Sequence, residues 1–176
     1  MIKRWMLILW ISMMFFTLAN AQVDTISIAG RHILLNEAPY TIKGVCYNPV
    51  PIGSDQRSFE NLKEDLVLMK EAGINTIRLY SPVDHKVILD EINNAGIKVI
   101  IGIGYNQGGY YDILSGSFID YINKYKDHPA ILLWELGNEY KYHPEWFEGD
   151  MKNWYKALNN SADLIHQSDA SHPVAT

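Results

Sequence analysis

A carboxylic acid beside an amide closes the most chemically suggestive segment of this chain. Residues 130–139, AILLWELGNE, form an apolar run that ends in Gly137, Asn138 and Glu139. Such a run predicts a buried parallel strand that delivers Asn138 and Glu139 to its carboxyl end. A carboxyl group at that place can act as a proton donor. Glu139 is therefore the candidate catalytic residue, although a helix cap or a surface ion pair would use the same residue type.

Three other predicted strands place polar or aromatic residues at their carboxyl ends. Tyr47 and Asn48 end the first, Arg78 lies near the end of the second, and Tyr105 follows the third. Aromatic rings stack on the apolar faces of sugars, while amides and Arg bind hydroxyl groups and orient carboxylates. These residues predict a carbohydrate-binding site. Arg78 in a structural ion pair remains an alternative.

The residues around the Asn-Glu pair have structural alternatives as well. Asn138 is a residue type that turns favour. Trp134 is expected to pack inside the fold rather than to serve as a sugar platform. Glu135 is expected to bond a neighbouring strand or Arg78, and Trp146 and Phe147 either line a substrate subsite or anchor their loop to the next helix.

Strand and helix patterns alternate along the chain. β-Prone runs at 25–28 and 31–35 predict a hairpin that either plugs the bottom of a barrel or belongs to a preceding domain. Strands are then predicted at 41–47, 74–80, 97–103 and 130–136, and helices at 59–72, 84–95, 117–126 and 150–167. Ser58 and Ser117 are the candidate helix caps, and residues 172–176 resemble the approach to a fifth strand.

This alternation predicts an α/β fold with parallel strands. A closed (β/α)8 barrel, or TIM barrel, needs about 250 residues, so we expect a barrel truncated after about four and a half βα units, preceded by the short β-hairpin. The alternative is a complete small open-sheet domain. The chain offers no GxGxxG motif after its first strand that would give such a domain a nucleotide to bind.

The first 21 residues predict a secretory signal peptide. Lys3 and Arg4 precede an apolar run, and Ala19-Asn20-Ala21 is a small-x-small cleavage site. Cleavage after Ala21 would leave residues 22–176 as a partial barrel domain, secreted or periplasmic and not held at a membrane. An uncleaved N-terminal anchor is the alternative, which the shortness of the apolar run disfavours.

Composition excludes several other classes of function. Without Lys3 and Arg4 the 15 basic residues become 13 against 20 acidic ones, a formal charge of −7, and no basic stripe favours nucleic acid. None of the six His residues forms an HExxH motif, so neither a metal nor another cofactor is expected. Cys46 is the single cysteine and is expected to be a small buried hydrophobe.

In sequence, the chain resembles the catalytic barrel of clan A glycoside hydrolases, especially the family 2 type. The resemblance rests on residues 28–49 (IAGRHILLNEAPYTIKGVCYNP), 72–82 (AGINTIRLYSP) and 128–139 (HPAILLWELGNE). It extends over residues 26–176. The last of these motifs is fairly specific, while the first two are informative mainly by their order.

The resemblance implies a role for each matching residue. Glu139 would be the general acid/base, Asn138 would bind the sugar 2-hydroxyl, and Arg78 would support the ionised form of the nucleophile. The family's nucleophile is a Glu at the end of the seventh strand, and no position of this chain matches it. The family's usual His at the end of the third or fifth strand has no clear counterpart either.

The sequence therefore predicts a retaining glycoside hydrolase acting on β-linked oligo- or polysaccharides, in a piece that is inactive without the second carboxylate. A β-glucan transglycosylase of similar architecture is the close alternative, because GVCYNP and INTIRLY resemble that group too. A non-catalytic carbohydrate-binding protein is the alternative from another class. The expected partner is a carbohydrate, and the sequence does not determine the oligomeric state.

Overall fold

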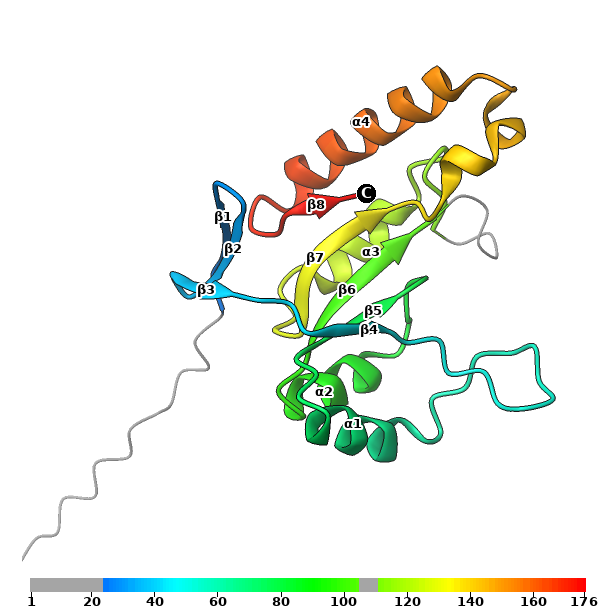
Figure 1. Ribbon diagram of the computed structural model, residues 1–176. Coiled ribbons are helices and arrows are strands. Elements are labelled where there is room, and N and C mark those ends of the chain that lie inside the picture. Colours follow the sequence, from blue (N-terminus) through cyan, green and yellow to red (C-terminus); the bar gives the residue numbers. More distant parts are fainter. Residues whose placement is uncertain (1–23, 105–110) are drawn as a thin grey trace, which may run out of the picture.

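The computed structural model describes residues 24–104 and 111–176, so the predicted signal peptide and Tyr105 lie outside the described residues. Two sheets are present, a three-stranded antiparallel one of order β1-β2-β3 and a five-stranded parallel one of order β4-β5-β6-β7-β8 (Figure 1). Their strands are β1 (Ile26–Ala29), β2 (His32–Leu35), β3 (Ala38–Tyr40), β4 (Gly44–Cys46), β5 (Thr76–Leu79), β6 (Lys98–Ile103), β7 (Ile131–Leu136) and β8 (Val174–Ala175).

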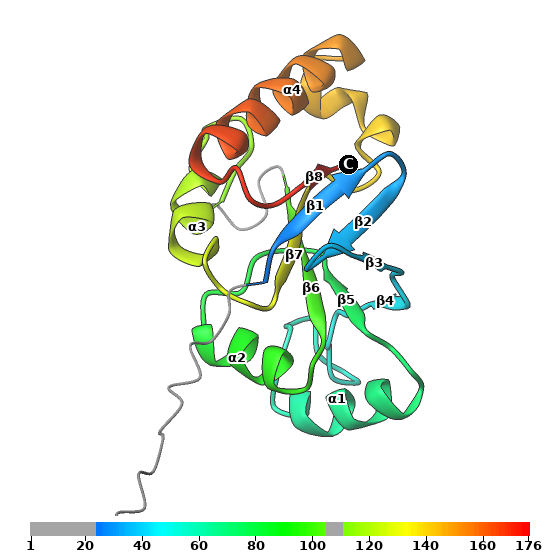
Figure 2. The ribbon, with the colours of Figure 1, turned by 90° about the vertical axis from the view of Figure 1, so that its left-hand side faces the viewer.

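Helices connect the strands of the parallel sheet and lie on one face of it (Figures 1 and 2). They are α1 (Leu62–Glu71), α2 (Lys86–Asn94), α3 (Phe118–Tyr125) and α4 (Met151–Ser168), and two short 3-10 turns, η1 (Tyr140–Tyr142) and η2 (Pro144–Phe147), precede α4. The predicted mixed α/β fold with parallel strands is thus confirmed, including the fifth strand near the end of the chain.

The core lies between the sheet and its helices. Alternate residues of the central strands, such as Ile77, Val99 and Trp134, are fully buried there. The Trp134 indole packs edge-on against Tyr121 of α3, and its Nε1 donates to Asp169 Oδ2 at 2.7 Å. The expected packing role of Trp134 is confirmed, and the last helix-to-strand turn is tied to the core through Asp169.

The small antiparallel sheet sits at the amino ends of the parallel strands (Figure 2). The Tyr40 hydroxyl donates to Asn75 O at 2.9 Å, just before β5, and Lys98 at the start of β6 pairs with Asp24 at 2.5 Å. Strand β3 was not predicted, because only the runs at 25–28 and 31–35 indicated a hairpin; it contains Pro39 and lies at an edge of its sheet, where Pro is tolerated. These contacts hold the small sheet against the starts of β5 and β6.

Two local predictions were wrong. Helix α1 begins at Leu62 after the N-cap Asn61, not at Phe59 after Ser58, because a turn in which Leu62 N donates to Phe59 O precedes it. Cys46 is exposed rather than buried. It lies on edge strand β4 in register with Arg78, on the sheet face that the four helices do not cover.

Among residues 24–104 and 111–176, no helix combines the length and the apolar character that crossing a membrane requires.

Candidate active site

Three of the predicted site residues converge at the carboxyl end of the parallel sheet. Arg78 extends from β5 toward the end of β7, where it meets Asn138, and Glu139 follows at the rim. Strand β6 lies between them, and its residue in register with Glu135 is Gly102, which brings no side chain to this face. A single long cation can therefore link two strands that are not neighbours.

Arg78 is held by two hydrogen bonds to residues of one segment. Its Nε donates to Glu135 Oε2 at 2.5 Å and its Nη2 donates to Asn138 Oδ1 at 3.0 Å. Its guanidinium also lies 4.5 Å from the centre of the Tyr80 ring. Burial opposes the charge, yet the hydrogen bond and charge of Glu135 raise the pKa of Arg78 above its usual value. Of the two partners expected for Glu135, a neighbouring strand or Arg78, the structure shows Arg78.

Glu139 stands at the point where the chain leaves β7. Its φ of +57° is in the left-handed region, and Gly137 two residues earlier has φ +80°. A Cβ on Gly137 would come within 2.9 Å of the Trp154 ring, so the sharp turn and the close approach of α4 both require glycine. The turn leaves the Glu139 side chain exposed, at the mouth of a cavity of about 440 Å³.

Aromatic side chains close the other side of this cavity. Tyr140 packs against Trp154 with 4.8 Å between ring centres, and Tyr155 lines the cavity while remaining 55% exposed. Phe147 is buried against Trp154, so it anchors the loop to α4. Trp146 instead stacks on His143 with 4.1 Å between ring centres. No sequence motif marked Tyr155. Its neighbour Trp154 is buried, whereas the Tyr155 side chain faces outward.

Two predicted binding residues lie away from this group. Tyr47 is 8% exposed, and its hydroxyl donates to Asp65 Oδ2 of α1 at 2.6 Å. Burial and the neighbouring carboxylate raise the pKa of that hydroxyl. Tyr47 thus faces the helix layer, while Asn48 is exposed in the following loop. Neither lines the cavity that contains Glu139, and the predicted site residue Tyr105 lies outside the described residues.

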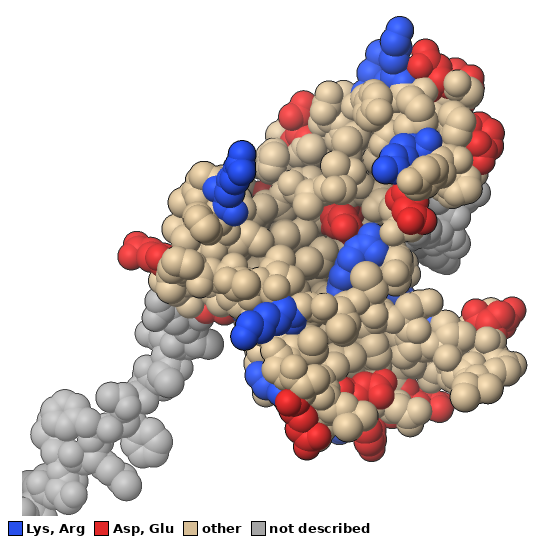
Figure 3. All heavy atoms as spheres, viewed as in Figure 1, with Lys and Arg blue, Asp and Glu red and all other residues tan. Residues whose placement is uncertain are grey.

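The described residues offer no group of three His, Cys, Asp or Glu side chains arranged to hold a metal ion. On the face shown in Figure 3, Lys and Arg lie scattered among Asp and Glu rather than gathered in one patch. The polar groups that line the cavity at the strand ends include the Glu135 and Glu139 carboxylates, the Asn138 amide and the Arg78 guanidinium.

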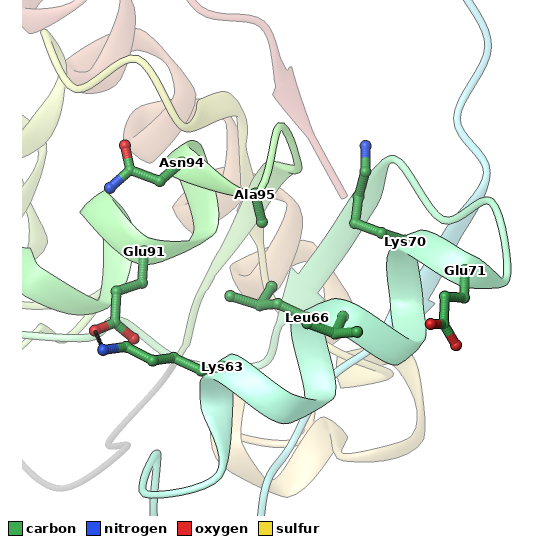
Figure 4. A pocket seen from close by; sticks show the side chains of 8 residues that line it. Lys63, Leu66, Lys70, Glu71, Glu91, Asn94 and Ala95 are labelled. Carbon is green, nitrogen blue, oxygen red and sulfur yellow. Dashed lines mark ion pairs between the residues drawn. The ribbon is translucent and has the colours of Figure 1, made fainter.

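A second hollow, of about 590 Å³, lies between α1 and α2 (Figure 4). Leu66 and Ala95 form its floor, and Lys63 and Glu91 pair across it at 3.4 Å. It belongs to the outer helices, whereas Arg78, Glu135 and Glu139 line the smaller cavity at the strand ends. Size alone therefore does not identify the site.

No protein-family model matches the chain. A putative β-glucuronidase of Formosa agariphila is 27% identical over 122 residues, which are 64% of this chain and 14% of that protein. A 1,3-β-glucanosyltransferase of Saccharomyces cerevisiae is 32% identical over 97 residues, which are 49% of this chain and 21% of that protein. The chain thus spans about a fifth or less of the length of these relatives.

Solved structures of β-glucuronidases share the fold. The β-glucuronidase of Faecalibacterium prausnitzii is 26% identical, with a TM-score of 0.67. The match covers 86% of this chain and 27% of the β-glucuronidase chain. The β-glucuronidase of Parabacteroides merdae is 19% identical, with a TM-score of 0.68, and the match covers 86% of this chain and 20% of that one. A family 2 glycoside hydrolase of Bacteroides cellulosilyticus is 21% identical, with a TM-score of 0.62, and the match covers 86% of this chain and 21% of that one.

Proposed function

We propose that the chain carries the acid/base half of a retaining β-glycosidase. Its similarity, over most of its length, to part of a family 2 glycoside hydrolase supports this proposal. Glu139 is the acid/base in this proposal. A second carboxylate, supplied by residues beyond those described, is the nucleophile. The substrate class is a β-linked oligo- or polysaccharide, and no resident metal or other cofactor takes part.

One observation carries this proposal. Glu139 opens onto the cavity that Arg78, Glu135 and Asn138 line, at the carboxyl ends of parallel strands. Enzymes built on βα units place their catalytic groups at those ends. The fold that presents these residues is the one shared with β-glucuronidases.

The proposed architecture is the first half of a (β/α)8 barrel within residues 22–176. Strands β4 to β8 would be five of its eight strands, and the face that carries Arg78 and Glu135 would be its interior. The antiparallel sheet of β1 to β3 would close the bottom of that barrel. Retaining hydrolysis needs two carboxyl groups about 5–5.5 Å apart, so the remaining strands would have to bring the nucleophile close to Glu139.

In the proposed reaction Glu139 first protonates the glycosidic oxygen while the nucleophile forms a bond to the anomeric carbon and the leaving group departs. Glu139 then takes a proton from water, which attacks the same carbon and releases the nucleophile. Two inversions give net retention. Asn138 would bind the sugar 2-hydroxyl, and Tyr105 and Asn48 remain proposed contributors to substrate binding, whereas the position of Tyr47 against α1 takes it out of that role.

We also propose that residues 1–21 are a cleaved signal peptide and that the protein is secreted or periplasmic. The sequence pattern of Lys3, Arg4 and Ala19-Asn20-Ala21 supports this location. A carbohydrate polymer outside the cell would then be accessible to the site.

Transfer of a β-glucan chain to a sugar hydroxyl is the second candidate function. The likeness to 1,3-β-glucanosyltransferases of Saccharomyces cerevisiae and Schizosaccharomyces pombe favours it, since these relatives are 32% and 34% identical over their matched residues. The first chemical step would be the same, and an acceptor hydroxyl would replace water in the second.

The test follows the first product formed by the full-length protein that contains this chain. Aryl β-glucuronide, β-galactoside and β-glucoside are supplied separately, and the anomer released is read by proton NMR before mutarotation. Release of the β-anomer from at least one of them is expected. With β-1,3-gluco-oligosaccharides, products longer than the substrate would establish transfer instead. Release of the α-anomer, or binding of sugar without any cleavage, would overturn the proposal.

A further inference from the structure

We infer that Glu135 is a positioning residue, which acts through Arg78 to turn the Asn138 amide nitrogen toward the sugar. This inference rests on the proposed function, because it concerns how the same site holds its substrate. It assigns to Glu135 a part in catalysis without any contact between Glu135 and the substrate.

The first step is the bond between Glu135 and Arg78. Glu135 Oε2 accepts from Arg78 Nε at 2.5 Å, and both side chains are only 18% exposed. Partly buried charges interact more strongly than charges on the surface, because less water screens them. Nε lies at the base of the planar guanidinium, so fixing Nε fixes the directions of both terminal nitrogens.

The second step is the bond between Arg78 and Asn138. Arg78 Nη2 donates to Asn138 Oδ1 at 3.0 Å. A guanidinium has donors and no acceptor, so the amide is obliged to present its oxygen to Arg78. The amide nitrogen then points away from Arg78, and within the described residues no protein group accepts a hydrogen bond from it.

In the third step, the backbone at the end of β7 brings two side chains to Arg78. Glu135 and Asn138 are three residues apart and lie on either side of the end of β7. Gly137 takes a φ of +80° between them, and both side chains reach the same guanidinium. The two donors of the Asn138 amide nitrogen are thereby left for an acceptor such as a sugar hydroxyl oxygen, in the cavity onto which Glu139 opens.

Without the Glu135 charge, other groups compete for Arg78. The Tyr80 ring lies 4.5 Å from the guanidinium, and Cys46 Sγ is 3.9 Å from Nη1. A guanidinium that rotates toward these groups no longer holds the Asn138 oxygen. The amide can then flip, and its donors lose their fixed direction before the sugar arrives.

The experiment is a double-mutant cycle in the full-length protein. Glu135→Gln, Asn138→Ala and their combination are compared on an aryl β-glycoside and on its 2-deoxy analogue. Glu135→Gln should lower kcat/KM about 10- to 100-fold on the first substrate, since a misplaced binding group can cost that much. The same change should cost less than about twofold on the 2-deoxy substrate, and also less than about twofold when Asn138 is already Ala.

Controls separate positioning from a general structural role. Glu91→Gln breaks the Lys63–Glu91 ion pair on the outer helices and should leave both rates unchanged. If Glu135→Gln fails to fold, Glu135→Asp carries the same prediction, because its shorter side chain draws the carboxylate away from Arg78 Nε. Equal losses on both substrates, or additive losses in the cycle, would overturn the inference. A wild-type protein that cleaves neither substrate would instead overturn the proposed function, and this inference with it.

Discussion

Replacing Glu139 with Gln is expected to lower kcat/KM by about 10²- to 10⁴-fold for aryl β-glycosides with poor leaving groups. Glycosides of strongly acidic phenols should lose far less. A poor leaving group needs a proton as the glycosidic bond breaks, and an amide has none to give. A strongly acidic phenol departs as the anion. Because kcat/KM covers the steps up to this first bond cleavage, the slope of its logarithm against leaving-group pKa measures the proton donation by Glu139.

Glu148 provides a matched control for this substitution. Like Glu139 it is exposed and has a φ of +57°, but it does not line the cavity that contains Arg78 and Asn138. Glu148→Gln should leave kcat/KM unchanged for every leaving group. Equal losses for good and poor leaving groups in Glu139→Gln would remove Glu139 from the role of acid.

The second large effect concerns stability. Asp169→Ala is expected to lower the free energy of unfolding by about 2–4 kcal/mol, the cost of losing charge-assisted hydrogen bonds and leaving a buried donor unpaired. Asp169 is 4% exposed. Its Oδ2 accepts from Trp134 Nε1 at 2.7 Å and lies 2.8 Å from His172 Nδ1, while its Oδ1 accepts from the amide of Ser171 at 2.9 Å. Urea unfolding at neutral pH measures the loss.

The pH dependence of this stabilisation has a defined sign. Burial opposes the charge of Asp169, yet the Trp134 hydrogen bond and the nearby His172 hold the pKa of its carboxyl below the usual value. A depressed pKa stabilises the fold above the unfolded value of about 4, and that contribution disappears as the pH falls through the folded pKa. The difference between wild type and Asp169→Asn should therefore shrink below about pH 4. A difference that is constant down to pH 2 would contradict this account.

Much of the fold could be predicted because strong local signals agreed with the tertiary structure. The apolar run that begins at Ala130 predicted a buried parallel strand, and every residue of β7 except Glu135 is buried. Gly73 and Gly96 follow the ends of α1 and α2 and both adopt positive φ, as glycines at that place commonly do. Arg78, one of the two partners expected for Glu135, is the one that the structure shows, since both side chains lie on strands of one parallel sheet.

Other features depended on information that the local sequence does not contain. Tyr47 follows the end of β4, where a site residue is expected. Its ring nevertheless faces the helix layer, where Asp65 of α1 accepts a hydrogen bond from its hydroxyl. Cys46 has apolar neighbours in sequence, but its exposure depends on β4 lying at the edge of the sheet. Asp169 has no motif, and its role appears only when α4 brings it to Trp134.

The most direct test of the acid/base assignment uses Glu139→Ala in the full-length protein with an activated aryl β-glycoside and sodium azide. Azide needs no general base, so it should attack the glycosyl-enzyme intermediate, restore turnover and yield the β-glycosyl azide. Formation of the α-glycosyl azide would instead identify Glu139 as the missing nucleophile. Turnover that azide does not change would contradict a role for Glu139 in either step.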